Sequence, residues 1–177
     1  SHKKGPIDPS FTLETLPPPE KHRLGWCYGD LSTAVALFNG YKTLGDRIYL
    51  DEVKTILDHG ITNRLTHYDP LVNSDFCHGL SGVIQIYNRF GNSLDPDRYH
   101  KFIEKFVREL FTRVRFEGDT VKLSTVDHPE TNWQTDTSLI YGLSGLALTL
   151  QALISDESPD WDAIFLLGLG QGFDKGA

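Results

Sequence analysis

Apolar side chains recur at helical spacing in three long runs, and each run follows a glycine. The runs start after Gly29, Gly79 and Gly142 and end near residues 41, 90 and 154. A second small residue follows three positions after each glycine, in the order Ser32, Gly82 and Gly145. Small residues one turn apart let another backbone approach closely and leave amide N–H groups open for polar contacts. We therefore predict three helices, each buried on most sides.

Amphipathic stretches alternate with these runs. Residues 48–57 and 102–111 place apolar side chains at helical spacing among charged ones, and residues 161–167 resemble a shorter stretch of the same kind. Residues 115–124 predict a short β-hairpin with its turn at Gly118, and residues 127–136 predict a polar loop. The alternation predicts an all-α fold of helical hairpin repeats in two layers.

Composition and charge indicate where the folded domain begins and ends and which partners are unfavourable. Residues 1–21 are rich in proline and predict an extended lead-in, residues 22–168 form the predicted repeat domain, and residues 169–177 predict a flexible tail. A net charge of -7 and a pI near 5.4 argue against nucleic acid as a partner. Since no window reaches about 18 apolar residues, we expect no membrane span and a cytoplasmic location.

The repeat register brings the two cysteines into equivalent positions. Cys27 and Cys77 each stand two residues before the glycine of their repeat, and His78 follows Cys77 directly. If the repeats stack around a common axis, the two thiols and the imidazole converge, and such a set suits zinc with one open position. The alternative is that both cysteines are small buried hydrophobes at tight helix starts, with His78 hydrogen-bonded locally.

Three short motifs carry a resemblance to a known family. They are Arg23-Leu-Gly-Trp-Cys-Tyr-Gly29, Phe76-Cys-His-Gly-Leu-Ser-Gly82 and Ile140-Tyr-Gly-Leu-Ser-Gly-Leu146. In this order and at this separation, they resemble the successive motifs of the lanthionine synthetase C-like family, the cyclases of lantibiotic biosynthesis and their relatives. The glycine motif alone is weak, but the Trp-Cys and Cys-His-Gly pair is specific. The resemblance covers the C-terminal half of the family's domain.

The resemblance implies a fold and a site. It implies an α/α toroid of two concentric helical rings, of which this chain would form a partial ring. It also implies that Cys27, Cys77 and His78 bind Zn²⁺. By the same resemblance Arg23 and Tyr28 lie beside the metal, where Arg23 would stabilise negative charge and Tyr28 would orient water or substrate; the alternatives are a solvated ion pair and an aromatic packing contact.

The implied activity is the addition of peptide cysteine thiols to dehydrated Ser or Thr, which forms thioether rings. The expected partners are a dehydrated precursor peptide or a small thiol, with a dehydratase as a further candidate. The family's acid–base histidine and its partnering aspartate lie upstream of the Trp-Cys motif, outside this sequence. We therefore assign no general acid or base, do not expect catalysis by the chain alone, and expect self-association or pairing with the missing half.

Two other functions stay open at this stage. The first is a zinc- and thiol-binding relative, of the glutathione type, or a scaffold without cyclase activity. The second is a helical repeat module whose inner helices pack on a partner and bind no metal. A measurement of zinc content distinguishes the repeat module, which would bind no zinc, from the zinc-binding functions.

Overall fold

The computed structural model describes residues 24–27, 29–66, 73–124 and 133–168. The predicted lead-in and tail lie outside these residues. The described elements are α1 (Asp30–Leu44), α2 (Arg47–Thr66), α3 (Leu80–Leu94), α4 (Pro96–Phe111), β1 (Val114–Glu117), β2 (Thr120–Ser124), β3 (Trp133–Gln134), α5 (Leu143–Ile154) and the 3-10 helix η2 (Trp161–Phe165).

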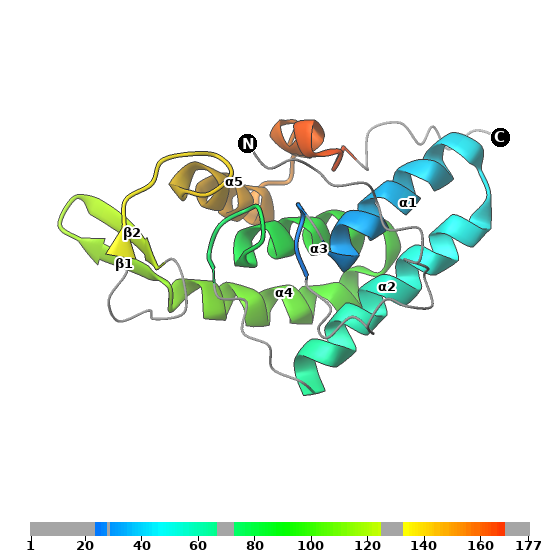
Figure 1. Cartoon of the computed structure of the whole chain (residues 1–177), viewed down its shortest axis with the longest axis horizontal. Coiled ribbons are helices and arrows are strands. Elements are labelled where there is room, and N and C mark those ends of the chain that lie inside the picture. The colour runs from blue at the N-terminus through cyan, green and yellow to red at the C-terminus, as the bar shows by residue number, and fades with distance from the viewer. Residues whose placement is uncertain (1–23, 28, 67–72, 125–132, 169–177) are drawn as a thin grey trace, which may run out of the picture.

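The helices pack as the predicted hairpins, with α3 at the centre (Figure 1). Helix α1 packs against α2, α3 packs against α4, and α3 also contacts α1 and α5. Tyr87 of α3 also links this helix to α2, because its buried hydroxyl donates a hydrogen bond to the carbonyl of Leu57 over 3.0 Å. The predicted all-α class of helical hairpins is confirmed.

Local signals explain where these helices start and stop. Helix α4 begins with Pro96 at its first position, and the Asp95 side chain accepts a hydrogen bond from the Arg98 amide. Helix α1 ends at Gly45, whose φ of 73° closes the helix with a hydrogen bond to the Tyr41 carbonyl. Each boundary is therefore set by residues next to it in the sequence.

Each glycine of the repeat register stands directly before a helix, as predicted. Gly29, Gly79 and Gly142 are the residues before α1, α3 and α5. We call the segments that lead into these helices the first turn (residues 24–29, with residue 28 not described), the second turn (residues 73–79) and the third turn (residues 136–142). The chain enters α1, α3 and α5 through these turns.

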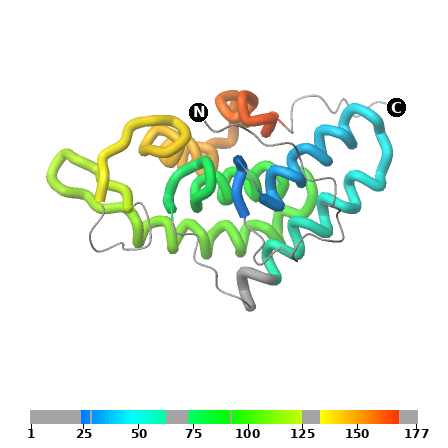
Figure 2. The backbone as a smooth tube through the Cα atoms, viewed as in Figure 1, coloured from blue at the N-terminus to red at the C-terminus, as the bar shows by residue number. Residues whose placement is uncertain are grey.

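Backbone hydrogen bonds join the three turns in one row. The amides of Trp26 and Cys27 donate to the Cys77 carbonyl, each over 3.0 Å. One turn further along, the amides of Phe76 and Cys77 donate to the Ile140 carbonyl over 3.0 and 3.1 Å. Figure 2 shows the segment of residues 24–27 beside the loop that leads into α3. Because the same bond pattern repeats, the cysteine of one turn is held against the next.

The sequence predictions need three corrections. Helix α3 is buried nearly all round, but α1 and α5 are buried on one face, because they flank α3 on the outside of the described residues. Residues 161–165 form a short 3-10 helix, which ends at Leu166 with φ 63°, in place of the amphipathic helix predicted over 161–167. The predicted hairpin exists as β1 and β2, and Trp133–Gln134 of the predicted loop add a third antiparallel strand.

Candidate metal centre

Two glycines decide how closely α3 and α5 approach the turns before them. A Cβ at Gly82 would lie 1.9 Å from the Phe76 carbonyl oxygen, and a Cβ at Gly145 would lie 2.1 Å from the Leu139 carbonyl oxygen. At the same register position α1 has Ser32, whose hydroxyl donates to the Gly29 carbonyl over 2.7 Å. Because glycine has no Cβ, Gly82 and Gly145 let α3 and α5 each pack closely against the turn that precedes it.

The first and second turns bring three candidate ligands together. One ligand atom from each of Cys27, Cys77 and His78 lies within 4.8 Å of the others. Tetrahedral zinc with thiolate and imidazole ligands holds those atoms about 3.5–3.8 Å apart, from metal–sulfur bonds of about 2.3 Å and metal–nitrogen bonds of about 2.0 Å. A small movement of these side chains would therefore bring their ligand atoms to the spacing that zinc requires. We call the three residues the thiol–histidine cluster.

The cluster is open on one side. Cys77 is buried, whereas Cys27 is exposed and the His78 side chain is 42% exposed. A catalytic zinc site needs three protein ligands and one accessible position, and the burial pattern leaves such access. The donor chemistry and the exposure therefore both fit zinc.

Ionisation of the buried thiol is unfavourable without a cation. Burial, then the neighbouring Cys27 thiol, raise the pKa of Cys77 to about 12. The Asp75 carboxyl beside it adds to this effect, while burial also raises the pKa of Asp75 itself. Two thiolates next to a carboxylate repel one another, so a divalent cation would stabilise the deprotonated pair.

Two residues that sequence reasoning did not single out hold the His78 ring. The Asn73 side-chain amide lies 2.6 Å from Nε2 of His78, and Oδ2 of Asp75 lies 3.6 Å from the same nitrogen. Oδ1 of Asp75 accepts the backbone N–H of His78 over 2.9 Å. Partners of this kind orient metal-binding histidines. Their position within four residues of the Cys-His pair was the one available sequence signal.

Aromatic side chains of the first and second turns pack against aromatic side chains of η2. Trp26 donates its indole N–H to the Phe165 carbonyl over 3.0 Å, and its ring packs against Phe165 and Phe76. Phe76 is fully buried and also contacts Phe165 and Trp161. The residues just before both cysteines therefore rest on η2, which explains why the Trp-Cys and Phe-Cys pairs carry a large aromatic.

The other predicted site residues have a different status. Arg23 and Tyr28 lie outside the described residues, so their predicted places beside the metal stay predictions. Tyr141 of the third turn, which was not predicted to act, does reach the cluster: its ring centroid lies 6.2 Å from that of His78. The signal for it was its register, since Tyr141 holds the position that His78 holds one repeat earlier.

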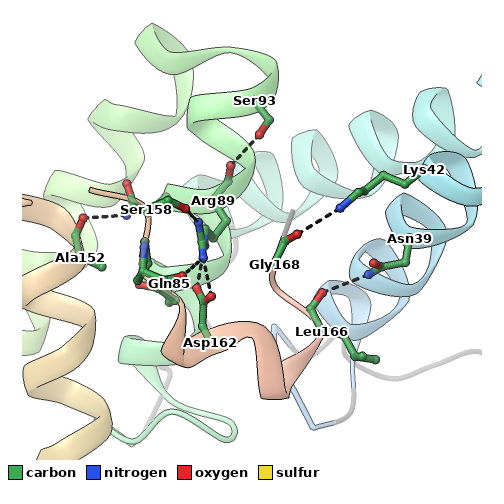
Figure 3. Close-up of polar contacts among 12 residues, drawn as sticks. Asn39, Lys42, Gln85, Arg89, Ser93, Ala152, Ser158, Asp162, Leu166 and Gly168 are labelled. Carbon is green, nitrogen blue, oxygen red and sulfur yellow. Dashed lines mark hydrogen bonds and ion pairs between the residues drawn. The ribbon is translucent and has the colours of Figure 1, made fainter. Parts of the chain in front are cut away.

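A second polar cluster lies further along α3 (Figure 3). Arg89 forms a two-pronged ion pair with Asp162 of η2, with its Nε 2.7 Å from Oδ2. Gln85 donates to the same carboxylate, and Arg89 also donates to the Ser158 hydroxyl and the Pro159 carbonyl. We call these five residues the arginine–aspartate cluster. It joins the C-terminal described segment to the central helix.

Comparisons with known proteins agree with this geometry. Residues 10–166 match the family described as lanthionine synthetase C-like protein, which is more than half of the chain. The chain belongs to this lanthionine synthetase C-like family. It is also 26% identical over 84 residues to the nisin biosynthesis protein NisC of Lactococcus lactis subsp. lactis. That alignment covers 48% of this chain but 19% of NisC. None of the described helices is long and apolar enough to cross a membrane.

Proposed function

We propose that this chain carries the zinc-binding part of a lanthionine cyclase, with Cys27, Cys77 and His78 as the three protein ligands. The observation that carries the proposal is the convergence of these three side chains within 4.8 Å in a chain of this family. Nisin biosynthesis, the process in the name of the NisC relative, supports a peptide substrate. Zinc when bound would supply positive charge that keeps a substrate thiol ionised at neutral pH.

The chain's own residues would prepare the site for a thiol. Cys27 and His78 are exposed at its mouth, so a substrate cysteine can approach between them, while buried Cys77 closes the inner side. Asn73 and Asp75 engage Nε2 of His78, which leaves Nδ1 for the metal. Two thiolate ligands make a metal less electrophilic than three imidazoles do, which favours activation of a thiolate over hydrolysis of water.

The bond changes of the proposed reaction balance without an oxidant or reductant. The thiolate sulfur of a peptide cysteine attacks the β-carbon of a dehydroalanine or dehydrobutyrine, and a carbon–sulfur bond forms. The electron pair of the double bond moves toward the α-carbon and its carbonyl, and a proton then adds at the α-carbon. We propose that Arg23 stabilises the negative charge and that Tyr28 orients the substrate or a water molecule. We assign no residue as the proton donor.

Metal content and thiol binding test the proposal directly. The purified chain is expected to hold one zinc per molecule after dialysis, and Cys77→Ala and His78→Ala are expected to lose it. A small thiol added to the cobalt-substituted chain is expected to change its visible spectrum, because it takes the open position. His100→Ala is the matched control, since His100 is an exposed histidine on α4 that pairs with Glu104. Stoichiometric zinc retained in both ligand variants would reject the assignment.

A further inference from the structure

The third turn contributes no ligand to the thiol–histidine cluster, yet its backbone is hydrogen-bonded to the second turn. Ile140 and Tyr141 stand where the second turn has Cys77 and His78. The Ile140 carbonyl accepts hydrogen bonds from the amides of both Phe76 and Cys77. The residue after Ile140 is therefore held beside the cluster by the same bond pattern that holds the second turn against the first.

Tyr141 makes side-chain contacts with two of the three ligands. Its ring meets that of His78 edge-on, at 6.2 Å between centroids and 63° between planes. Its hydroxyl lies near the Cys77 thiol, close enough for the two side chains to interact.

Packing does not account for this position. Tyr141 is 52% exposed, although tyrosines of the core such as Tyr87 and Tyr99 are almost fully buried. Nor does the turn need a tyrosine hydroxyl for its own backbone, since the Tyr141 amide is bonded to the Ser138 hydroxyl and the glycine after it bonds back to the Ser138 carbonyl. The Tyr141 side chain is therefore available to interact with the thiol–histidine cluster.

We propose that Tyr141 is a positioning residue of the metal centre, whose hydroxyl donates a hydrogen bond to Sγ of Cys77 and whose ring forms one wall of the open side. This inference rests on the proposed metal site. A hydrogen bond to a ligand sulfur withdraws electron density from it. With less charge on Cys77, the site binds an incoming thiolate more readily, because three anionic sulfurs around one cation repel one another.

The test replaces only the hydroxyl. Tyr141→Phe keeps the ring and its contact with His78 but removes the donor to Cys77. In the cobalt-substituted chain, the sulfur-to-metal charge-transfer band is expected to move to longer wavelength, because the Cys77 thiolate becomes more electron-rich. Binding of 2-mercaptoethanol, followed by the same spectrum, is expected to weaken about tenfold. Metal stoichiometry is expected to stay at one per chain.

Tyr49→Phe is the matched control, because Tyr49 lies on α2 beside Gly40 and away from the turns. It is expected to leave the band and the thiol affinity unchanged. If Tyr141→Phe binds cobalt with an unshifted band and unchanged thiol affinity, the role of Tyr141 is wrong while the metal site stands. If the unaltered chain shows no sulfur-to-cobalt band, the proposed metal site is wrong, and the inference about Tyr141 is wrong with it.

Discussion

One polar cluster lies on α3 and the other on the turns before α1 and α3, and they differ in how their charges are balanced. In the arginine–aspartate cluster the Arg89 guanidinium meets a carboxylate with 0% exposure, and neutral groups complete its hydrogen bonds. In the thiol–histidine cluster two thiols lie beside the Asp75 carboxyl, and the pKa of Cys77 is raised to about 12, mainly by burial. The charges of the first cluster are balanced within the chain, whereas the second becomes favourable when a cation joins it.

The difference shows how residues that stabilise this fold can be distinguished from residues that bind a metal. A buried charge that has an internal partner serves to hold segments together, and its loss should reduce stability. A convergent set of ligands with one exposed side should lose metal when altered, with a smaller effect on folding. Three substitutions test this separation, since one affects only the first cluster, one affects the backbone between the clusters, and one affects only the second.

The largest expected effect is that of Asp162→Asn. The substitution keeps the size of the side chain but leaves the Arg89 guanidinium buried without its countercharge. Loss of one partner of a buried pair costs about 3–5 kcal/mol, so the free energy of unfolding should fall by about that amount. Urea denaturation followed by circular dichroism measures it. Zinc content of the folded protein should be unchanged.

The matched control is Asp58→Asn. Asp58 forms the same kind of pair with Arg98, at 3.0 Å, but both side chains are 40% exposed or more. Exposed pairs contribute less than about 1 kcal/mol, so this variant should stay close to the unaltered protein. Equal losses from the two variants would show that burial does not distinguish the pairs, and the structural role of the first cluster would be wrong.

An intermediate effect is expected for Gly82→Ala, which adds a methyl group against the second turn. The new Cβ would lie 1.9 Å from the Phe76 carbonyl oxygen, and a backbone atom cannot rotate away. We expect a loss of about 3 kcal/mol in the free energy of unfolding, as for severe overpacking. Because Phe76 directly precedes Cys77, zinc affinity should fall as well. Thermal unfolding with and without zinc measures both effects.

Gly40→Ala supplies the comparison within a helix. A Cβ at Gly40 would lie 3.9 Å from the Tyr49 ring, which is an ordinary contact. Alanine is a better helix former than glycine, so this variant should be more stable by up to about 1 kcal/mol. A Gly82→Ala protein that equals Gly40→Ala in stability and in zinc binding would contradict the close approach of α3 to the second turn.

Much of this arrangement could be predicted from the sequence, because it depends on local signals. The glycine register predicted where α1, α3 and α5 begin, and the equivalence of Cys27 and Cys77 predicted their convergence. The contact between Arg89 and Asp162 could not be predicted, since either residue alone resembles a solvated charge and 73 residues separate them. The repeat register places Tyr141 where His78 stands one repeat earlier, but its contact with the cluster also depends on the backbone bonds between the turns, which the register alone does not specify.

The ring itself stays a prediction, as do the roles of Arg23 and Tyr28 and the expected self-association or pairing. The described helices confirm the hairpins from which a toroid is built, but the closure of a ring depends on contacts beyond them. Periodicity predicts which face of a helix is apolar, and it does not specify the partner of that face. This is also why α1 and α5 were wrongly predicted to be buried on most sides.

The smallest expected effect is that of Asn73→Ala, which affects only the second cluster. Its side-chain amide lies 2.6 Å from Nε2 of His78, whereas its backbone carbonyl separately accepts the Leu80 amide. The substitution therefore loosens the histidine ring without breaking the turn. Zinc affinity, measured by competition with a chelator, should fall about tenfold, the lower end for residues that orient a ligand. The midpoint of thermal unfolding of the metal-free protein should hardly change.

Asn88→Ala tests whether the effect depends on the place of the amide. Asn88 lies on α3, and its side chain donates to the Ala152 carbonyl over 3.3 Å, away from the turns. It should leave zinc affinity unchanged, although it removes the same chemical group. If Asn73→Ala binds zinc as tightly as Asn88→Ala does, His78 does not depend on Asn73 for its orientation. Asp75, with 3.6 Å to Nε2 and a bond to the His78 amide, would then hold the ring alone.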